Sequence, residues 1–144
     1  KASASQIPWA LDDGVGTLLP VMQSDIMLES KSGDTVLIID AKYYTHTLVE
    51  NRFNARMLHS ANLYQIFTYV KNKDTDMGDG EHAVSGMLLY AKTDEELQPD
   101  NSYQMSGNKI SVRTLDLNQE FPEIAKQLDD IAAEHFASTV ALVE

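Results

Sequence analysis

The sequence predicts an α/β domain in which helices flank a mixed central sheet. Two predicted strands joined by a polar turn, 17–29 and 35–44, favour an antiparallel pair. An amphipathic helix then separates the second strand from another apolar strand at 84–90, and a right-handed crossover through such a helix makes the two strands parallel neighbours. A second amphipathic helix, 121–136, completes a sheet flanked by helices.

Each of the first two strands has its own signals. Pro20 marks the beginning of the strand at 17–29 or a bulge within it, because proline has no N–H to donate to a strand ladder. The polar, glycine-containing segment 30–34 is typical of a hairpin loop. The run from Val36 to Ile39 contains only Leu and β-branched residues, which indicates a strand buried on both faces.

The middle of the chain is predicted to form a loop, a helix and a second loop. The polar segment 45–53 is expected to be a loop, a helix is predicted over 54–71, and the acidic segment 72–81 is expected to be a surface loop. Apolar residues recur at helical spacing along the predicted helix: Leu58, Ala61, Leu63, Ile66, Phe67 and Val70.

The C-terminal part is predicted to add a hairpin and the last helix. An acidic loop is expected at 93–101, and the alternating segments 102–106 and 109–117 predict a hairpin. The helix at 121–136 has Pro122 in its first turn, where no helical hydrogen bond is lost. Its inner face is expected to consist of Ile124, Leu128, Ile131 and Phe136.

Composition limits the class of protein. The chain has 144 residues and is 43% hydrophobic, which is enough for one domain with its own core. It contains no cysteine, which excludes disulfides, a thiolate nucleophile and zinc sites with cysteine ligands. No apolar run approaches the length that spans a bilayer, so we expect a cytoplasmic protein. Because the sequence begins with Lys1 rather than Met, we expect a fragment of a longer chain.

Acidic and basic side chains lie within the two predicted strands at 17–29 and 35–44. Side chains alternate between the faces of a strand, so Asp40 and Lys42 project to the same side. If the two strands are antiparallel neighbours, Asp25 reaches the same position. Two carboxylates and an ammonium group would then converge, an arrangement suited to a divalent-metal site for phosphodiester hydrolysis.

Two polar residues interrupt the apolar surface of the predicted helix. Gln65 and Tyr69 are four positions apart and therefore share one helical face. They can be surface residues, or a glutamine and a tyrosine that bond to each other within the core. The four histidines show no metal-ligand spacing, and His46 is the one that lies close to the site.

Taken together, these motifs resemble the PD-(D/E)XK nuclease superfamily, and within it the RecB-like branch with Gln-x-x-x-Tyr on the helix. Ser24-Asp25 stands where that superfamily has Pro-Asp, Asp40-Ala41-Lys42 matches its (D/E)-x-K element, and Gln65 to Tyr69 matches the helix motif. More closely, the segments LLPVMQSDIML, VLIIDAKYY and NLYQIFTYV are similar to the C-terminal nuclease domain of the McrC family.

This resemblance implies a restriction-endonuclease-like core and a single nuclease domain over 1–144, in which 1–16 is peripheral, 17–90 is the catalytic core and 91–144 supplies the C-terminal hairpin and helix. It implies a DNA endonuclease subunit of a modification-dependent restriction system, activated by a McrB-like, GTP-driven AAA+ partner, with oligomers expected only in the full assembly. A glutamate on an upstream helix, found in several families of the superfamily, cannot be placed in this sequence.

The chemistry of phosphodiester hydrolysis suggests a role for each candidate residue. Asp25 and Asp40 are expected to bind Mg²⁺, which Mn²⁺ can replace, with the Ala41 backbone carbonyl as a third ligand. Lys42 is expected to stay charged, to orient the attacking water and to stabilise developing negative charge. Gln65 would position water or a backbone phosphate, and Tyr69 would bond to a DNA phosphate or brace the site.

Charge raises an objection and leaves alternatives open. The formal net charge of −11 disfavours DNA binding by the chain alone. Segment 41–73, however, carries five basic residues against Glu50 alone. A nuclease-like scaffold that activates a motor, with vestigial carboxylates, and a stand-alone RecB-like nuclease therefore remain alternatives to a partner-dependent endonuclease.

Overall fold

The computed structural model describes residues 2, 3, 5–53 and 55–141, so Asn54, with which the predicted helix begins, and residues 142–144 of the predicted domain lie outside it. The described strands and helices are β1 (Ala2–Ser3), β2 (Gln6–Ile7), β3 (Met22–Gln23), β4 (Ile26–Glu29), β5 (Thr35–Lys42), β6 (Leu48–Glu50), β7 (Arg56–Leu58), α1 (Ser60–Asp76), β8 (Ala83–Ala91), β9 (Asn101–Met105), β10 (Asn108–Leu115) and α2 (Phe121–Ala141).

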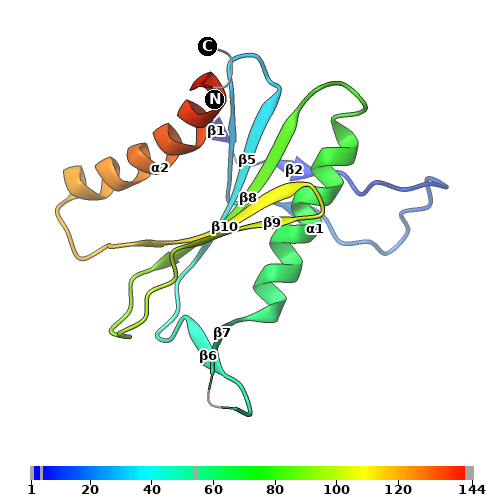
Figure 1. Ribbon diagram of the computed structural model, residues 1–144. Helices are drawn as coiled ribbons and strands as arrows, with labels where there is room; N and C mark the ends of the chain where they lie inside the picture. Colours follow the sequence, from blue (N-terminus) through cyan, green and yellow to red (C-terminus); the bar gives the residue numbers. More distant parts are fainter. Residues whose placement is uncertain (1, 4, 54, 142–144) are drawn as a thin grey trace.

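Within these described residues, six strands form one mixed sheet in the order β1-β4-β5-β8-β10-β9 (Figure 1). Strands β4 and β5 are antiparallel and β5 and β8 are parallel, and both predicted pairings are thereby confirmed. The predicted C-terminal hairpin is β9 with β10, and β10 also pairs with β8 in parallel. The predicted fold class, an α/β domain with a mixed central sheet, is therefore correct.

The two helices lie on opposite faces of the sheet, α1 to the right and α2 to the left in Figure 1. Side chains at even positions of β5, Val36 and Ile38, belong to the core cluster that contains Ile66 and Val70 of α1. The odd positions belong to a second cluster that contains Ile131 of α2. Residues 36–39 are all buried, as the apolar run predicts, and the face toward α1 is the one that bears the candidate site.

Helix α1 packs closely on β8 because a glycine lies beneath it. A Cβ atom added to Gly86 would meet Ile66 Cγ1 and Val70 Cγ2 at 2.7 Å each, and Ile110 Cδ1 at 3.2 Å. Ordinary carbon contacts are about 3.5–4.0 Å. The absent side chain therefore sets the distance between α1 and the sheet.

The prediction of one continuous strand over 17–29 is wrong. Extended structure is confined to β3 and β4, and β3 pairs with β2 outside the main sheet. Leu18 has a positive φ of 69° and is 98% exposed, and Pro20 has no N–H, so neither residue suits a strand ladder.

The segment predicted as the loop 45–53 and the beginning of a helix contains a small hairpin instead. Strands β6 and β7 pair antiparallel, with Val49 opposite Met57. Because Leu58 ends a strand, the helix begins at Ser60 rather than near residue 54. It also continues to Asp76, through part of the segment predicted as the loop 72–81.

The last helix begins as predicted but packs differently along its length. Ile131 is 6% exposed and Phe136 packs against the same cluster, whereas Leu128 is 38% exposed, contrary to the prediction. In Figure 1 the N-terminal end of α2 stands away from the sheet, which explains that exposure. Among the described residues, neither helix is long and apolar enough to cross a membrane.

Candidate active site

The candidate site lies where β5 ends and β4 begins. Ile26 is the register partner of Ile39, which places Asp25 beside Asp40 on the neighbouring strand. The Asp25 Oδ2 atom accepts a hydrogen bond of 2.8 Å from the Ala41 N–H. A strand residue directs its N–H and C=O to the same side, so the Ala41 carbonyl also projects toward Asp25. The structure therefore brings together the two carboxylates and the carbonyl that the sequence singled out.

Asp40 and Lys42 form a close ion pair on the side of the sheet that faces α1. The Lys42 Nζ atom lies 2.7 Å from Asp40 Oδ2, and the two side chains are 17% and 5% exposed. Within the described part of the chain, Asp40 Oδ2 is covered completely and accepts no hydrogen bond beyond this ion pair. A carboxylate oxygen in this position retains lone pairs for another cation.

The electrostatics of the pair follow from burial and from mutual attraction. Burial raises the pKa of the Asp40 carboxyl above its ordinary value, the Lys42 ammonium partly offsets this, and the Asp25 charge adds to it. Burial lowers the pKa of the Lys42 ammonium, but Asp40, with smaller contributions from Tyr44 and Asp25, raises it, and the resulting pKa lies above its ordinary value. Lys42 is therefore a cation at neutral pH.

A chain of hydrogen bonds connects Lys42 to α1. The Lys42 Nζ donates to Gln65 Oε1 at 2.8 Å, and Gln65 Nε2 donates to the Tyr69 hydroxyl at 2.9 Å. Tyr69 is 9% exposed. Of the two readings of this pair, the one in which the side chains bond to each other within the protein agrees with the structure.

Three further residues lie next to this chain of hydrogen bonds and were not identified from the sequence: Tyr44, Asn62 and Tyr90. The Asn62 Nδ2 donates to the buried Tyr90 hydroxyl at 3.0 Å, and the Tyr44 hydroxyl donates to Asn62 Oδ1 at 3.3 Å. Tyr90 is the register partner of Lys42. Asn62 precedes Gln65 by three positions and Tyr69 by seven, and this helical spacing is the signal that could have identified it.

The donor set fits a hard divalent cation. Asp25, Asp40 and the Ala41 carbonyl supply oxygen atoms, and Mg²⁺ is typically held by one or two carboxylates while it retains water and takes phosphate oxygens. Within the described residues, no group of three or more His, Asp or Glu side chains gathers as a fuller metal cage. The described residues that precede β3 form short strands and a loop. They include no helix that could carry the additional glutamate found in several families of the superfamily.

The histidines lie apart from these donors. His82 pairs with Asp74 at 2.5 Å, at the far end of α1 from Gln65. His59 packs its ring against Tyr44, with the ring centroids 5.2 Å apart. His46 is exposed in the segment that precedes β6. None of these positions gives histidine the role of a metal ligand beside Asp40.

Comparison with known proteins finds similarity to proteins of restriction systems. No family model matches it. Among curated proteins it is similar to the type IV methyl-directed restriction enzyme EcoKMcrBC of Escherichia coli (strain K12), at 32% identity over 138 residues, which are 94% of this chain and 37% of that protein. The chain thus spans well under half of the length of that relative.

A solved structure shares the fold. The refined half-complex from a tetradecameric assembly of Thermococcus gammatolerans McrB AAA+ hexamers with bound McrC matches 90% of this chain and 28% of the compared chain, with a TM-score of 0.55 and 14% identity. Both comparisons agree with the resemblance that the motifs indicate. The chain is therefore McrC-like, and its mixed α/β core agrees with the expected restriction-endonuclease-like fold.

Proposed function

We propose that this chain is the endonuclease subunit of a modification-dependent restriction system and hydrolyses DNA phosphodiester bonds with Mg²⁺. The observation that carries the proposal is the convergence of five side chains, from the residue that precedes β4, from β5 and from α1, on the α1 face of the sheet. These are Asp25, Asp40, Lys42, Gln65 and Tyr69. A scaffold has no need to bury a carboxylate beside an ammonium group at a strand end.

The carboxylates have the task of holding the cation. Asp25 and Asp40, with the Ala41 carbonyl, would bind Mg²⁺, which when bound lowers the pKa of a water ligand and polarises a phosphate oxygen. The cation also favours the ionised form of Asp40, whose pKa burial raises. Mn²⁺, which also prefers oxygen ligands, is expected to substitute.

The other residues act on charge and position. The Asp40 carboxylate favours the charged form of Lys42 and raises its pKa, so a role as a cation is favoured over a role as a base until a bound metal offsets the carboxylates. Lys42 orients the attacking water and stabilises the charge that develops on the phosphate. Gln65 fixes the Lys42 ammonium and positions water or phosphate, and Tyr69 fixes the amide of Gln65.

A partner must deliver the substrate. A chain with a net charge of −11 binds nucleic acid weakly by itself, because affinity depends on basic groups that displace counterions. The solved structure with the same fold contains McrB AAA+ hexamers with bound McrC, which supports a McrB-like AAA+ partner. We further propose that this partner is driven by GTP and presents methylated DNA to this subunit, in keeping with the methyl-directed restriction enzyme to which the chain is similar. The site of action is then the cytoplasm.

The test is cleavage by the full-length subunit assembled with its AAA+ partner, in wild type and in Asp40→Ala. We expect the variant to lose cleavage while partner assembly and GTP turnover persist. Asp79→Asn, which changes a carboxylate in the exposed loop after α1, is the matched control and should cleave normally. Unchanged cleavage by Asp40→Ala would favour the scaffold, and cleavage without the partner would favour a stand-alone nuclease.

A further inference from the structure

The segment that connects β5 to α1, residues 43–59, begins beside the candidate site. It leaves β5 after Lys42 and returns at the beginning of α1, and the two ends of the segment touch through the rings of Tyr44 and His59 at 5.2 Å. The Tyr44 hydroxyl also bonds to Asn62 of α1. The hairpin β6–β7 in this segment is therefore tied at its base to the elements that carry Lys42 and Gln65.

A buried carboxylate fixes that base further. Glu95, whose side chain is 4% exposed, accepts hydrogen bonds from the N–H groups of Thr47 at 2.6 Å and Leu48 at 3.4 Å. Its Oε2 atom also lies 3.5 Å from Arg56 Nη1. Burial raises the pKa of Glu95, but these bonds and that from Thr93 lower it by more, so the carboxylate is ionised at neutral pH.

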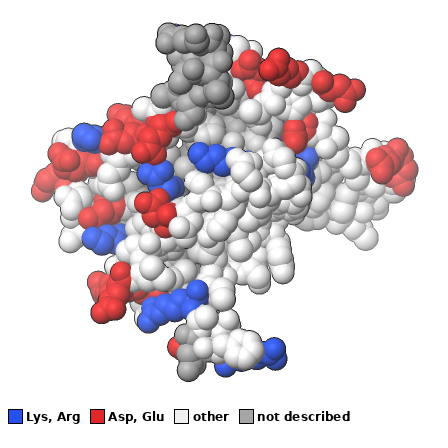
Figure 2. All heavy atoms as spheres, in the orientation of Figure 1, with Lys and Arg blue, Asp and Glu red and all other residues white. Residues whose placement is uncertain are grey.

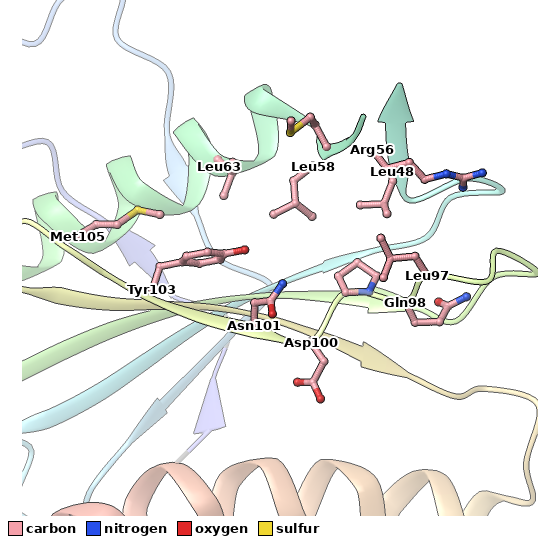
Figure 3. A pocket seen from close by; sticks show the side chains of 12 residues that line it. Leu48, Arg56, Leu58, Leu63, Leu97, Gln98, Asp100, Asn101, Tyr103 and Met105 are labelled. Carbon is pink, nitrogen blue, oxygen red and sulfur yellow. The ribbon is translucent and has the colours of Figure 1, made fainter. Parts of the chain in front are cut away.

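Behind the hairpin lies a pocket rather than a packed interface. A pocket of about 580 Å³ separates Leu48 and Leu58 on the hairpin from Leu97, Tyr103 and other residues of the opposite wall (Figure 3). The hairpin is thus supported at its base and stands off the sheet, and it projects from the lower end of the molecule in Figure 1.

The tip of the hairpin presents a cation and an aromatic ring. The Arg52 guanidinium lies 4.8 Å from the centroid of the Phe53 ring, and Phe53 is 74% exposed. Among the described residues, no carboxylate forms an ion pair with Arg52, while the side chain of Arg56 on β7 is 54% exposed. Stacking of this kind orders an arginine while leaving its N–H groups free to donate.

Charge distinguishes this hairpin from most of the surface. The hairpin itself, residues 48–58, carries Arg52 and Arg56 against Glu50, a net charge of +1 in a chain of −11. Figure 2 shows basic side chains on the projecting hairpin with acidic atoms beside them, acidic side chains along the upper right, and both kinds together on the left of the same view. A polyanion that approaches this face is attracted to the hairpin and repelled by the acidic margin.

We propose that the β6–β7 hairpin contacts duplex DNA beside the phosphate that is cleaved, with Arg52 bonding to the DNA backbone and Phe53 packing against sugars or base edges. This inference rests on the proposed function, because it places DNA at Asp25 and Asp40. The four steps from Leu48 to Arg52 span about 13 Å at about 3.3 Å per strand residue. That length is about four base-pair steps of 3.4 Å, which is how far along a duplex the hairpin extends from its base.

The experiment measures DNA binding by the full-length subunit assembled with its partner, with a fluorescently labelled methylated duplex as the probe. Arg52→Glu and Phe53→Ala are compared with Lys31→Glu and Phe121→Ala, which change an exposed lysine in the loop after β4 and a 78% exposed phenylalanine at the beginning of α2. We expect about tenfold weaker binding for Arg52→Glu, from the loss of a charge-assisted bond. The slope of log affinity against log salt should shrink by about 1.

Each outcome decides the question. Weaker binding by both hairpin variants, with unchanged binding by both controls and intact partner assembly, supports the proposal. Affinity and salt slope equal to the controls overturn it, and so does loss of partner assembly, which would assign the hairpin to a protein interface. Asp40→Asn, measured in parallel, tests the proposed function separately from the hairpin. Continued cleavage by that variant contradicts the proposed function, whatever the hairpin variants do.

Discussion

Gly86→Ala tests whether the seating of α1 on the sheet controls the candidate site. The added Cβ would lie 2.7 Å from Ile66 and Val70, so α1 has to retreat by about 1 Å to restore ordinary contacts of about 3.7 Å. Gln65 is the neighbour of Ile66 and moves with it. Its 2.8 Å bond to Lys42 would lengthen to nearly 4 Å, which is no longer a hydrogen bond.

Two quantities should change together. Overpacking of this size costs about 1–3 kcal/mol of unfolding free energy. A displacement of about 1 Å in a catalytic group lowers the rate by up to about 100-fold. We expect a lower thermal midpoint in a calorimetric scan and slower DNA cleavage by the assembled complex, with Val70→Ala in the same chain relieving part of both effects by removing one of the clashing methyl groups.

The matched control is Gly80→Ala, because a Cβ at Gly80 meets nothing within 4 Å and its backbone lies outside the positive-φ region. This control should leave midpoint and cleavage unchanged. If Gly86→Ala lowers stability but cleaves as fast as wild type, the position of α1 does not govern the site. If Gly86→Ala changes neither quantity, α1 does not pack against Gly86 as closely as described above.

Three further outcomes follow from the structure. Glu95→Ala leaves the buried N–H of Thr47 without its acceptor, so equilibrium unfolding in urea should show a loss of about 1–3 kcal/mol, and a loss below the fitting error contradicts this anchor. The bond to Asp74 raises the pKa of His82. The stabilisation from this pair is therefore present below about pH 6.5 and is lost as the pH rises through the raised pKa of His82. The thermal midpoint of wild type should exceed that of His82→Gln only in the acidic range. Tyr69→Phe removes a hydroxyl worth about 1 kcal/mol, so single-turnover cleavage should slow about fivefold, and an unchanged rate would reduce Tyr69 to a packing residue.

Much of the site was predictable because strand geometry is local. Alternation alone places Asp40 and Lys42 on one side, and the hydrophobic run of β5 identifies a central strand. The antiparallel pairing that brings Asp25 to Asp40 follows from the short polar turn between the strands. The helical spacing of Gln65 and Tyr69 likewise specifies that they share a face.

The hairpin β6–β7 was not predictable by the same means. Its strands are three residues each, and Leu58 continues the helical pattern of apolar residues that follows it, so periodicity assigns it to the helix. The anchor that stabilises the hairpin, Glu95, lies 48 positions from Thr47 in the sequence. A contact that depends on the assembled fold leaves no local signal at either residue.

The central claim is that Asp25 and Asp40 bind one cation, and crystals of the protein soaked in Mn²⁺ test it most directly. We predict a single anomalous peak with a carboxylate oxygen of each aspartate within about 2.0–2.2 Å, and its disappearance in crystals of Asp40→Asn. A fully occupied peak bound elsewhere, or two aspartates that stay without metal while the protein still cleaves DNA, would contradict the claim.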